Sequence, residues 1–110
     1  MKSENFLPES KLLWEELGGG VSRQIAGYDD AVMLVKVKFI KGAIGVVHQH
    51  FQSQCSFVIS GAFEVAINEE KRILKTGDGF YVEPNALHGV VCLENGMLID
   101  AFSPAREDFL

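Results

Sequence analysis

The chain has 110 residues and 47% of them are hydrophobic, which predicts one folded domain over residues 1–110 rather than a disordered chain. Its net charge is −5 and its basic residues are scattered, so we expect no nucleic-acid partner, because an acidic chain repels phosphate backbones. No apolar run approaches the roughly 18 residues of a membrane span, and residues 1–9 lack the apolar core of a secretory signal. These absences predict a cytoplasmic protein with no membrane partner.

The first 20 residues are predicted to form an irregular N-terminal segment. Pro8 is suited to open a short helical turn that runs through Trp14 and Leu17. Three consecutive glycines at positions 18–20 are expected to end that turn.

The rest of the chain is predicted to be all-β. Val35, Val37 and Phe39 alternate with two lysines, as expected for a strand with one buried face. Further turn signals are found at Gly61 and at residues 94–96. Strands are expected at residues 32–40, 46–50, 54–59, 63–67, 73–74, 80–82, 89–93 and 97–102. Short strands with turn signals at close intervals are typical of a sandwich or barrel.

The only three histidines of the chain are predicted to lie together. His48, His50 and Gln54 have the same parity, so an extended segment over residues 48–54 would point all three side chains to one side. His88 follows downstream as a third imidazole. Three imidazole nitrogens and one amide oxygen suit one divalent transition metal ion, such as Zn, Ni, Fe, Co or Mn.

The two cysteines, Cys55 and Cys92, form no CxxC motif and are expected to be reduced, although the sequence leaves a disulfide open. Cys55 has the wrong parity to join the metal ligands. Cys92 shares the parity of His88, and a buried structural thiol is its more typical role.

The spacing around the histidines resembles the first cupin motif. Gly42 is followed by five residues, HXH, three residues, Gln54 in the place of the usual Glu, six residues and Gly61. Residues 77–88 resemble the second motif, which ends in the remaining metal histidine, His88. The resemblance implies a small double-stranded β-helix, or jelly-roll barrel, over about residues 30–102.

The chain is also similar to the pectin-degradation cupins of the KdgF type. The similarity is carried by residues 20–30, by YVEPNALHG at residues 81–89 and by the C-terminal residues 98–110. In those proteins a Gln replaces the cupin Glu, as Gln54 does here. The resemblance implies that Asp100, Phe102 and Arg106 correspond to the active-site residues of that family.

The residues themselves support part of this assignment. Asp100 shares one face of a predicted strand with Leu98 and Phe102, and an inward carboxylate is costly unless it is paired or near a metal. Without the resemblance, Phe102 is more typical of core and Arg106 of surface. Arg23 and Gln24 are other candidates for the pocket, with the surface as their more typical place.

The function that the resemblance implies is ring opening of 4,5-unsaturated monouronates, derived from pectin or alginate, to a linear 4-deoxy-5-keto-uronate. The metal ion would act as a Lewis acid, Asp100 would move the proton, and Phe102 and Arg106 would bind the small anionic sugar. Arg106 suits a carboxylate because its guanidinium is a planar fork. Cupins commonly dimerise, so a homodimer is expected.

Two alternatives stay open at this point. One is a metal-dependent cupin dioxygenase, which oxygen uptake would reveal. The other is a non-catalytic sugar-binding cupin, in which the metal site is filled but no unsaturated uronate is turned over. The sequence leaves the native metal and the preferred uronate epimer undetermined.

Overall fold

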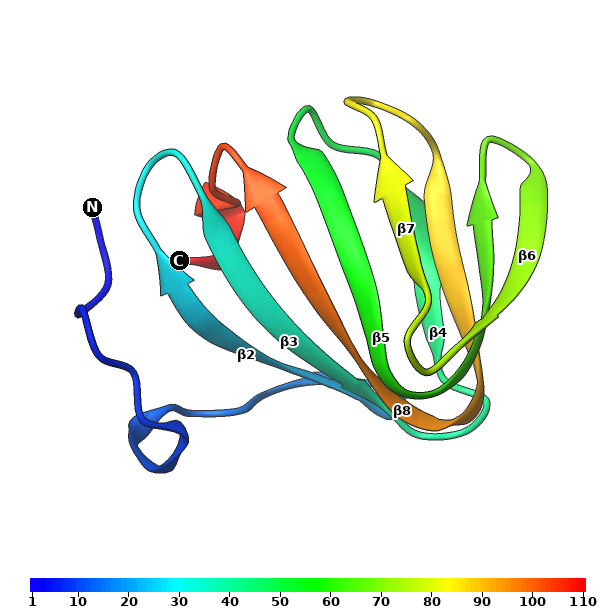
Figure 1. Cartoon of the computed structure of the whole chain (residues 1–110), viewed down its shortest axis with the longest axis horizontal. Helices are drawn as coiled ribbons and strands as arrows, with labels where there is room; N and C mark the ends of the chain where they lie inside the picture. Colours follow the sequence, from blue (N-terminus) through cyan, green and yellow to red (C-terminus); the bar gives the residue numbers. More distant parts are fainter.

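Strands dominate the structure, a computed structural model that describes all 110 residues (Figure 1). Two 3₁₀ helices and eight strands occur in this order: η1 (Glu9–Lys11), β1 (Glu15–Gly18), β2 (Val21–Tyr28), β3 (Met33–Phe39), β4 (Ile44–His48), β5 (Ser53–Ile67), β6 (Glu70–Lys75), β7 (Gly79–Val82), β8 (His88–Ser103) and η2 (Glu107–Phe109). The two helices are short 3₁₀ segments, and neither could span a membrane. The predicted all-β fold class is confirmed.

Two long antiparallel strands, β5 and β8, form the centre of the fold and pair along most of their length. The first half of β8 also pairs with β4, and its second half pairs with β3. The first half of β5 pairs with β7, and its second half pairs with β6. Figure 1 therefore shows β2 and β3 on one side of the central strands, and β4, β6 and β7 on the other. This arrangement encloses an interior between the two halves.

Two glycines allow the central strands to cross closely where the sheet bends. Gly61 has φ +86°, and a Cβ atom there would lie 2.6 Å from the Asn95 carbonyl oxygen. A Cβ on Gly96 would collide with the carbonyl oxygen of Ser60. The predicted turns at Gly61 and at residues 94–96 are therefore wrong. These glycines lie within continuous strands, at points where two backbones approach closely. In the sequence, a glycine of this kind resembles a turn signal.

The N-terminal prediction is also partly wrong. The 3₁₀ helix covers Glu9–Lys11 alone, and β1 occupies residues that were assigned to an irregular segment. β2 pairs with β3, so the barrel begins at Val21 rather than near residue 30. The alternation of buried and exposed residues that marks a strand is obscured in β2, because Gln24 on its outer face is also buried. The Gln24 amide lies 3.5 Å from the Leu12 carbonyl oxygen of the N-terminal segment, which covers this face.

Apolar side chains fill the interior in two clusters. The larger cluster consists of Val21, Phe39, Ala43, Val58, Phe63, Val65, Cys92 and Leu98, and the smaller one of Met33, Val35, Phe102 and Ala105. The Cys92 thiol is buried in the larger cluster and donates to the Glu94 carbonyl, whereas Cys55 is exposed. Both cysteines are free, as expected for reduced thiols.

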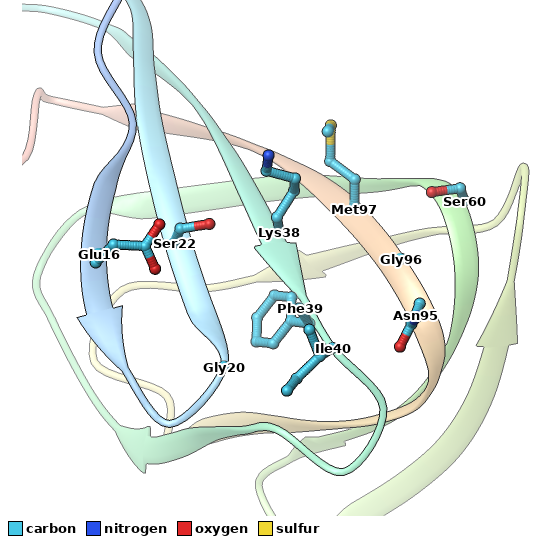
Figure 2. A pocket seen from close by; sticks show the side chains of 10 residues that line it. All are labelled: Glu16, Gly20, Ser22, Lys38, Phe39, Ile40, Ser60, Asn95, Gly96 and Met97. Carbon is cyan, nitrogen blue, oxygen red and sulfur yellow. The ribbon is translucent and has the colours of Figure 1, made fainter.

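An outer hollow of about 510 Å³ lies where β1, β2, β3, β5 and β8 meet (Figure 2). It is lined by Glu16, Gly20, Ser22, Lys38, Phe39, Ile40, Ser60, Asn95, Gly96 and Met97. Figure 2 shows Lys38 and Met97 pointing away from the buried Phe39. The outer hollow therefore presents mainly the solvent-facing side of the sheet.

Candidate active site

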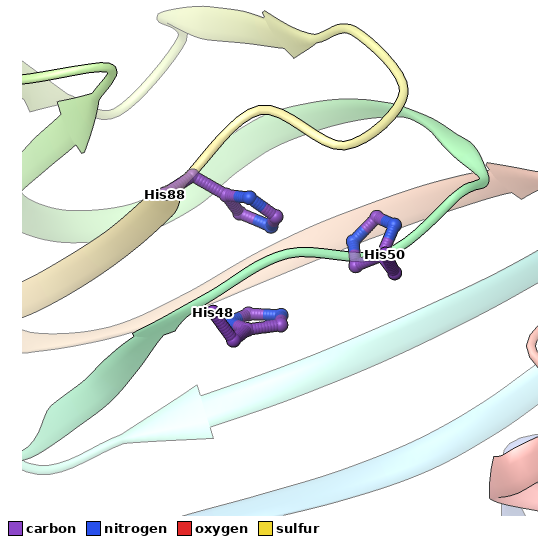
Figure 3. Close-up of side chains that lie close together, drawn as sticks. All are labelled: His48, His50 and His88. Carbon is purple, nitrogen blue, oxygen red and sulfur yellow. The ribbon is translucent and has the colours of Figure 1, made fainter.

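The three histidines converge from two neighbouring strands. β4 ends at His48, β8 begins at His88, and these two residues are paired in register. His50 follows in the loop after β4. The ring centroids of His48 and His88 lie 4.4 Å apart, and that of His50 lies 4.8 Å from His88. Figure 3 shows the three rings gathered around one point, and one potential ligand atom of each lies within 4.8 Å of the others.

Backbone carbonyls set the same tautomer in all three rings. The Nδ1 atoms of His48, His50 and His88 lie 2.9, 3.1 and 2.8 Å from a carbonyl oxygen two residues away. A carbonyl oxygen only accepts, so each Nδ1 carries the hydrogen and each neutral ring has its lone pair on Nε2. The Nε2 atom of His88 is buried and has no hydrogen-bond partner. The three histidines therefore form a potential metal site with free Nε2 lone pairs.

Burial keeps two of these rings neutral. It lowers the pKa of His88 to about 4, and it also lowers the pKa of His50. The positive charge of Arg106 and the neighbouring His48 act in the same direction on both rings. Neutral imidazoles are the form that coordinates a metal ion.

Gln54 completes the donor set. Its Oε1 atom lies 3.0 Å from His50 Nε2, although the neutral ring has no hydrogen there. Two lone pairs that face each other at this distance are stabilised by a cation held between them. Three imidazole nitrogens and one amide oxygen therefore fit a divalent transition metal ion.

The predicted extended segment over residues 48–54 is wrong as a strand, although the side chains meet as expected. β4 ends at His48 and β5 begins at Ser53, with a loop between them. Gln52 is buried in this loop, and its amide donates to the Ala105 carbonyl at 3.2 Å. This long-range bond holds the loop against the C-terminal segment, and its partner is 53 residues away in the chain.

A cavity of about 170 Å³ joins candidate metal ligands to the residues that the family resemblance indicated. Its walls include His48, Gln54, His88, Asp100, Phe102 and Arg106. The His50 ring packs edge-on against Phe102 at 5.5 Å. The structure therefore brings the three histidines and Gln54 close to Asp100, Phe102 and Arg106.

Asp100 lies on the inward face of β8 between the buried residues Leu98 and Phe102. Burial raises the pKa of its carboxyl group to about 6, although a hydrogen bond from Ser56 and the charge of Arg106 oppose the rise. The Ser56 hydroxyl donates to Asp100 Oδ1 at 2.6 Å. The carboxyl group is therefore able to gain or lose a proton near neutral pH.

Arg106 enters the cavity from the start of η2, and its side chain is only 11% exposed. Its Nε and Nη2 atoms donate to the Asp108 carboxylate at 3.0 and 2.8 Å, which lowers the pKa of Asp108. The guanidinium carbon lies 4.3 Å from the centroid of Phe109. One edge of the guanidinium is thus held by Asp108, and Nη1 is left without a partner from this pair.

Arg23 is a cavity residue that the sequence reading placed at the surface. Its guanidinium carbon lies 3.8 Å from the Phe109 centroid, and its Nε donates to Glu15 at 2.8 Å. Arg23 is two residues after the buried Val21, so in a strand both side chains point to the same side, and this alternation could have placed Arg23 in the cavity. Gln24, by contrast, faces away from the cavity, and Cys92 does not line it. Phe80 and Phe109 complete the aromatic part of the wall.

Comparisons with known proteins agree with this geometry. Residues 35–100 match the family model of the cupin domain. The chain is 54% identical over 99 residues to the pectin degradation protein KdgF of Dickeya dadantii (strain 3937). The aligned region covers 88% of this chain and 90% of the relative.

Two solved structures share the whole fold. An RmlC-like cupin from Shewanella frigidimarina NCIMB 400 superposes with a TM-score of 0.97 at 46% identity, over 99% of this chain and 98% of the other. KdgF from Halomonas sp. superposes with a TM-score of 0.91 at 39% identity, over 98% and 99% of the two chains. The fold, the spacing of the site residues and these matches together show that this chain belongs to the cupin family and, within it, to the KdgF group.

Proposed function

We propose that this protein is a metal-dependent enzyme that opens the ring of 4,5-unsaturated monouronates to give linear 4-deoxy-5-keto-uronates. The observation that carries the proposal is one cavity whose wall includes His48, His88, Gln54, Asp100 and Arg106. The third histidine, His50, lies beside it, with its Nε2 atom 3.0 Å from the Gln54 oxygen. The relative from Dickeya dadantii is named a pectin degradation protein, which supports a substrate derived from pectin.

His48, His50, Gln54 and His88 are proposed to hold one divalent ion, of Zn, Ni, Fe, Co or Mn. When bound, such an ion supplies Lewis acidity toward oxygen atoms of the sugar. The neutral amide of Gln54 adds no charge to the site, so the site keeps its attraction for an anionic sugar.

Asp100 is proposed to move the proton. The carboxylate takes the hydrogen of the C1 hydroxyl, the C1 oxygen forms a carbonyl, and the bond between C1 and the ring oxygen breaks. The ring oxygen keeps that electron pair as an enolate. The enolate then becomes a ketone at C5 as C4 receives a proton, which Asp100 is able to return. No atom is gained or lost overall, and a pKa of about 6 suits a group that both accepts and donates.

Arg106 and Phe102 are proposed to orient the sugar. The part of the guanidinium that Asp108 leaves free suits the substrate carboxylate. Phe102 is 3% exposed and packs against His50, so it offers a rigid apolar wall between the metal site and Arg106. A fixed sugar orientation keeps its C1 and C4 positions near Asp100.

The proposal is tested by incubating the purified, metal-loaded protein with unsaturated monouronate released by a lyase. We expect NMR to show the open-chain product forming faster than in buffer without protein, with no oxygen consumed. Oxygen uptake would indicate a dioxygenase instead, and bound but unchanged sugar would indicate a sugar-binding protein. Homodimer formation and a cytoplasmic location stay predictions.

A further inference from the structure

Ser56 lies between Gln54, which adjoins the histidine cluster, and the carboxyl group of Asp100. It is a β5 residue, two positions after Gln54, and it is paired in register with Asp100 on β8. Its side chain is buried, with 6% exposure of the residue. The Gln54 Nε2 amide donates to Ser56 Oγ at 2.9 Å, and the Ser56 hydroxyl donates to Asp100 Oδ1 at 2.6 Å. Since His50 adjoins Gln54, one continuous chain of contacts joins the histidines to Asp100.

The directions of these hydrogen bonds are coupled. A serine hydroxyl has one hydrogen, and an ionised carboxylate only accepts, so Ser56 must donate to Asp100. Ser56 is then left to accept from Gln54, which it does from the NH₂ end of the amide. The carbonyl end of Gln54 consequently faces His50, where a metal ligand is needed.

The opposite orientation of Gln54 has a specific cost. A reversed amide would turn its oxygen toward Ser56, and the single hydroxyl hydrogen could then satisfy only one of two acceptors. Asp100 would be left without its donor in a buried site, which is costly. Reversal of the whole chain would require a proton on Asp100, whereas the proposed function needs Asp100 ionised when it takes the proton of the sugar.

We propose that Ser56 is a positioning residue that directs the Gln54 oxygen toward the histidines and links this ligand to the carboxylate of Asp100. The inference rests on the proposed function, because that function assigns Gln54 to the metal and Asp100 to proton transfer. Ser56 itself touches neither the ion nor the sugar in this scheme. Its one hydroxyl group orients the amide of Gln54 by accepting a hydrogen bond, and holds the carboxylate of Asp100 by donating one.

Zinc affinity tests this role without an activity measurement. Metal-stripped parent and Ser56→Ala proteins are titrated with zinc in competition with a chromogenic chelator. We expect Ser56→Ala to raise the zinc dissociation constant about 10- to 100-fold, as loss of a group that orients a metal ligand does. Ser56→Thr keeps the hydroxyl and should bind zinc within about threefold of the parent. Ser60→Ala removes an exposed hydroxyl of the same strand and serves as the control.

A second pair of variants covers the case in which Ser56→Ala does not fold. Ser56→Thr and Ser56→Val both have β-branched side chains of similar shape, so they differ mainly in the hydroxyl group. The Val variant should bind zinc at least about tenfold more weakly than the Thr variant. Equal zinc affinities in either comparison would overturn the role of Ser56.

The outcomes also separate this inference from the proposed function. A parent that opens unsaturated uronates, with a Ser56→Ala variant of unchanged zinc affinity, would sink the inference and leave the function standing. A parent that binds zinc through a Ser56-dependent site but opens no uronate would sink the function and support the inference. A parent that binds no zinc at this site would contradict both.

Discussion

The inner cavity and the outer hollow share strands β1, β2, β3, β5 and β8, yet they offer different chemistry. The cavity is about 170 Å³, and its polar wall consists of two imidazoles, an amide, a carboxyl group and the guanidinium groups of Arg23 and Arg106, with the third imidazole of the cluster beside it. The outer hollow is about 510 Å³, and its only charged side chains are Glu16 and Lys38 (Figure 2). Volume alone would favour the outer hollow as the binding site, whereas the reactive side chains lie in the inner cavity. The difference comes from parity, since neighbouring residues such as Val37 and Lys38 face opposite sides of the same strand.

The largest expected effect within the cavity is that of Asp100→Asn. Asn keeps the shape of the side chain and an oxygen that accepts from Ser56, but it removes the proton acceptor. We expect turnover of unsaturated monouronate to fall roughly 10²–10⁴-fold with the metal content unchanged. Steady-state kinetics and elemental analysis on the same sample would check both points. Full activity of the variant would remove Asp100 from the mechanism.

Arg106→Ala should have the next largest effect. It removes the proposed carboxylate anchor, so the apparent affinity for the sugar should fall about 10- to 100-fold, the range for a hydrogen bond to a charged group. Turnover also falls if the sugar loses its orientation. A thermal melt and the metal content should match those of the parent. An effect confined to unfolding or metal loss would show that Arg106 is structural.

The pH dependence sharpens the same assignment. Burial raises the pKa of Asp100 to about 6, and the base form is the ionised one. Activity should therefore be full above that pH and fall as the pH drops through 6, by about tenfold in kcat/KM for each further unit. A pH profile of kcat/KM at constant metal occupancy measures this. A flat profile between pH 5 and 7 would conflict with a base of this pKa.

Gln54→Glu should have a smaller effect. A carboxylate still ligates the ion, but its charge repels the anionic sugar and reduces the Lewis acidity of the site. We expect retained metal and roughly tenfold weaker binding or turnover, which is about 1.4 kcal/mol and lies within the range for a charge pair at close distance. Equal conversion by parent and variant would show that the charge argument is wrong.

Changes in the outer hollow should have the smallest effect. Lys38→Ala and Met97→Ala alter its wall but do not reach the cavity. We expect kcat/KM on unsaturated monouronate to stay within about twofold of the parent, as is usual for surface changes. A large loss would mean that this region takes part in sugar binding, and the comparison drawn above would fail.

Short-range sequence patterns predicted part of the candidate site, whereas Phe102 and Arg106 were indicated only by the family resemblance. Alternation placed Asp100 inward, and the spacing of His48, His50 and Gln54 grouped the ligands. Long-range contacts decided what the sequence did not reveal. Gly96 is predicted to be a turn residue, but in the structure it allows the β8 backbone to pass close to the Ser60 carbonyl oxygen on β5. Arg23 is predicted to lie at the surface, but its stacking on Phe109, which is close to the other end of the chain, brings it into the cavity.

A crystal structure of the metal-loaded Asp100→Asn variant with unsaturated monouronate would test the central claim most directly. We predict that the sugar lies in the inner cavity, with its carboxylate on Arg106, its oxygen atoms toward the ion held by the three histidines, and C1 and C4 near residue 100. Sugar bound in the outer hollow, or a carboxylate that points away from Arg106, would contradict the account.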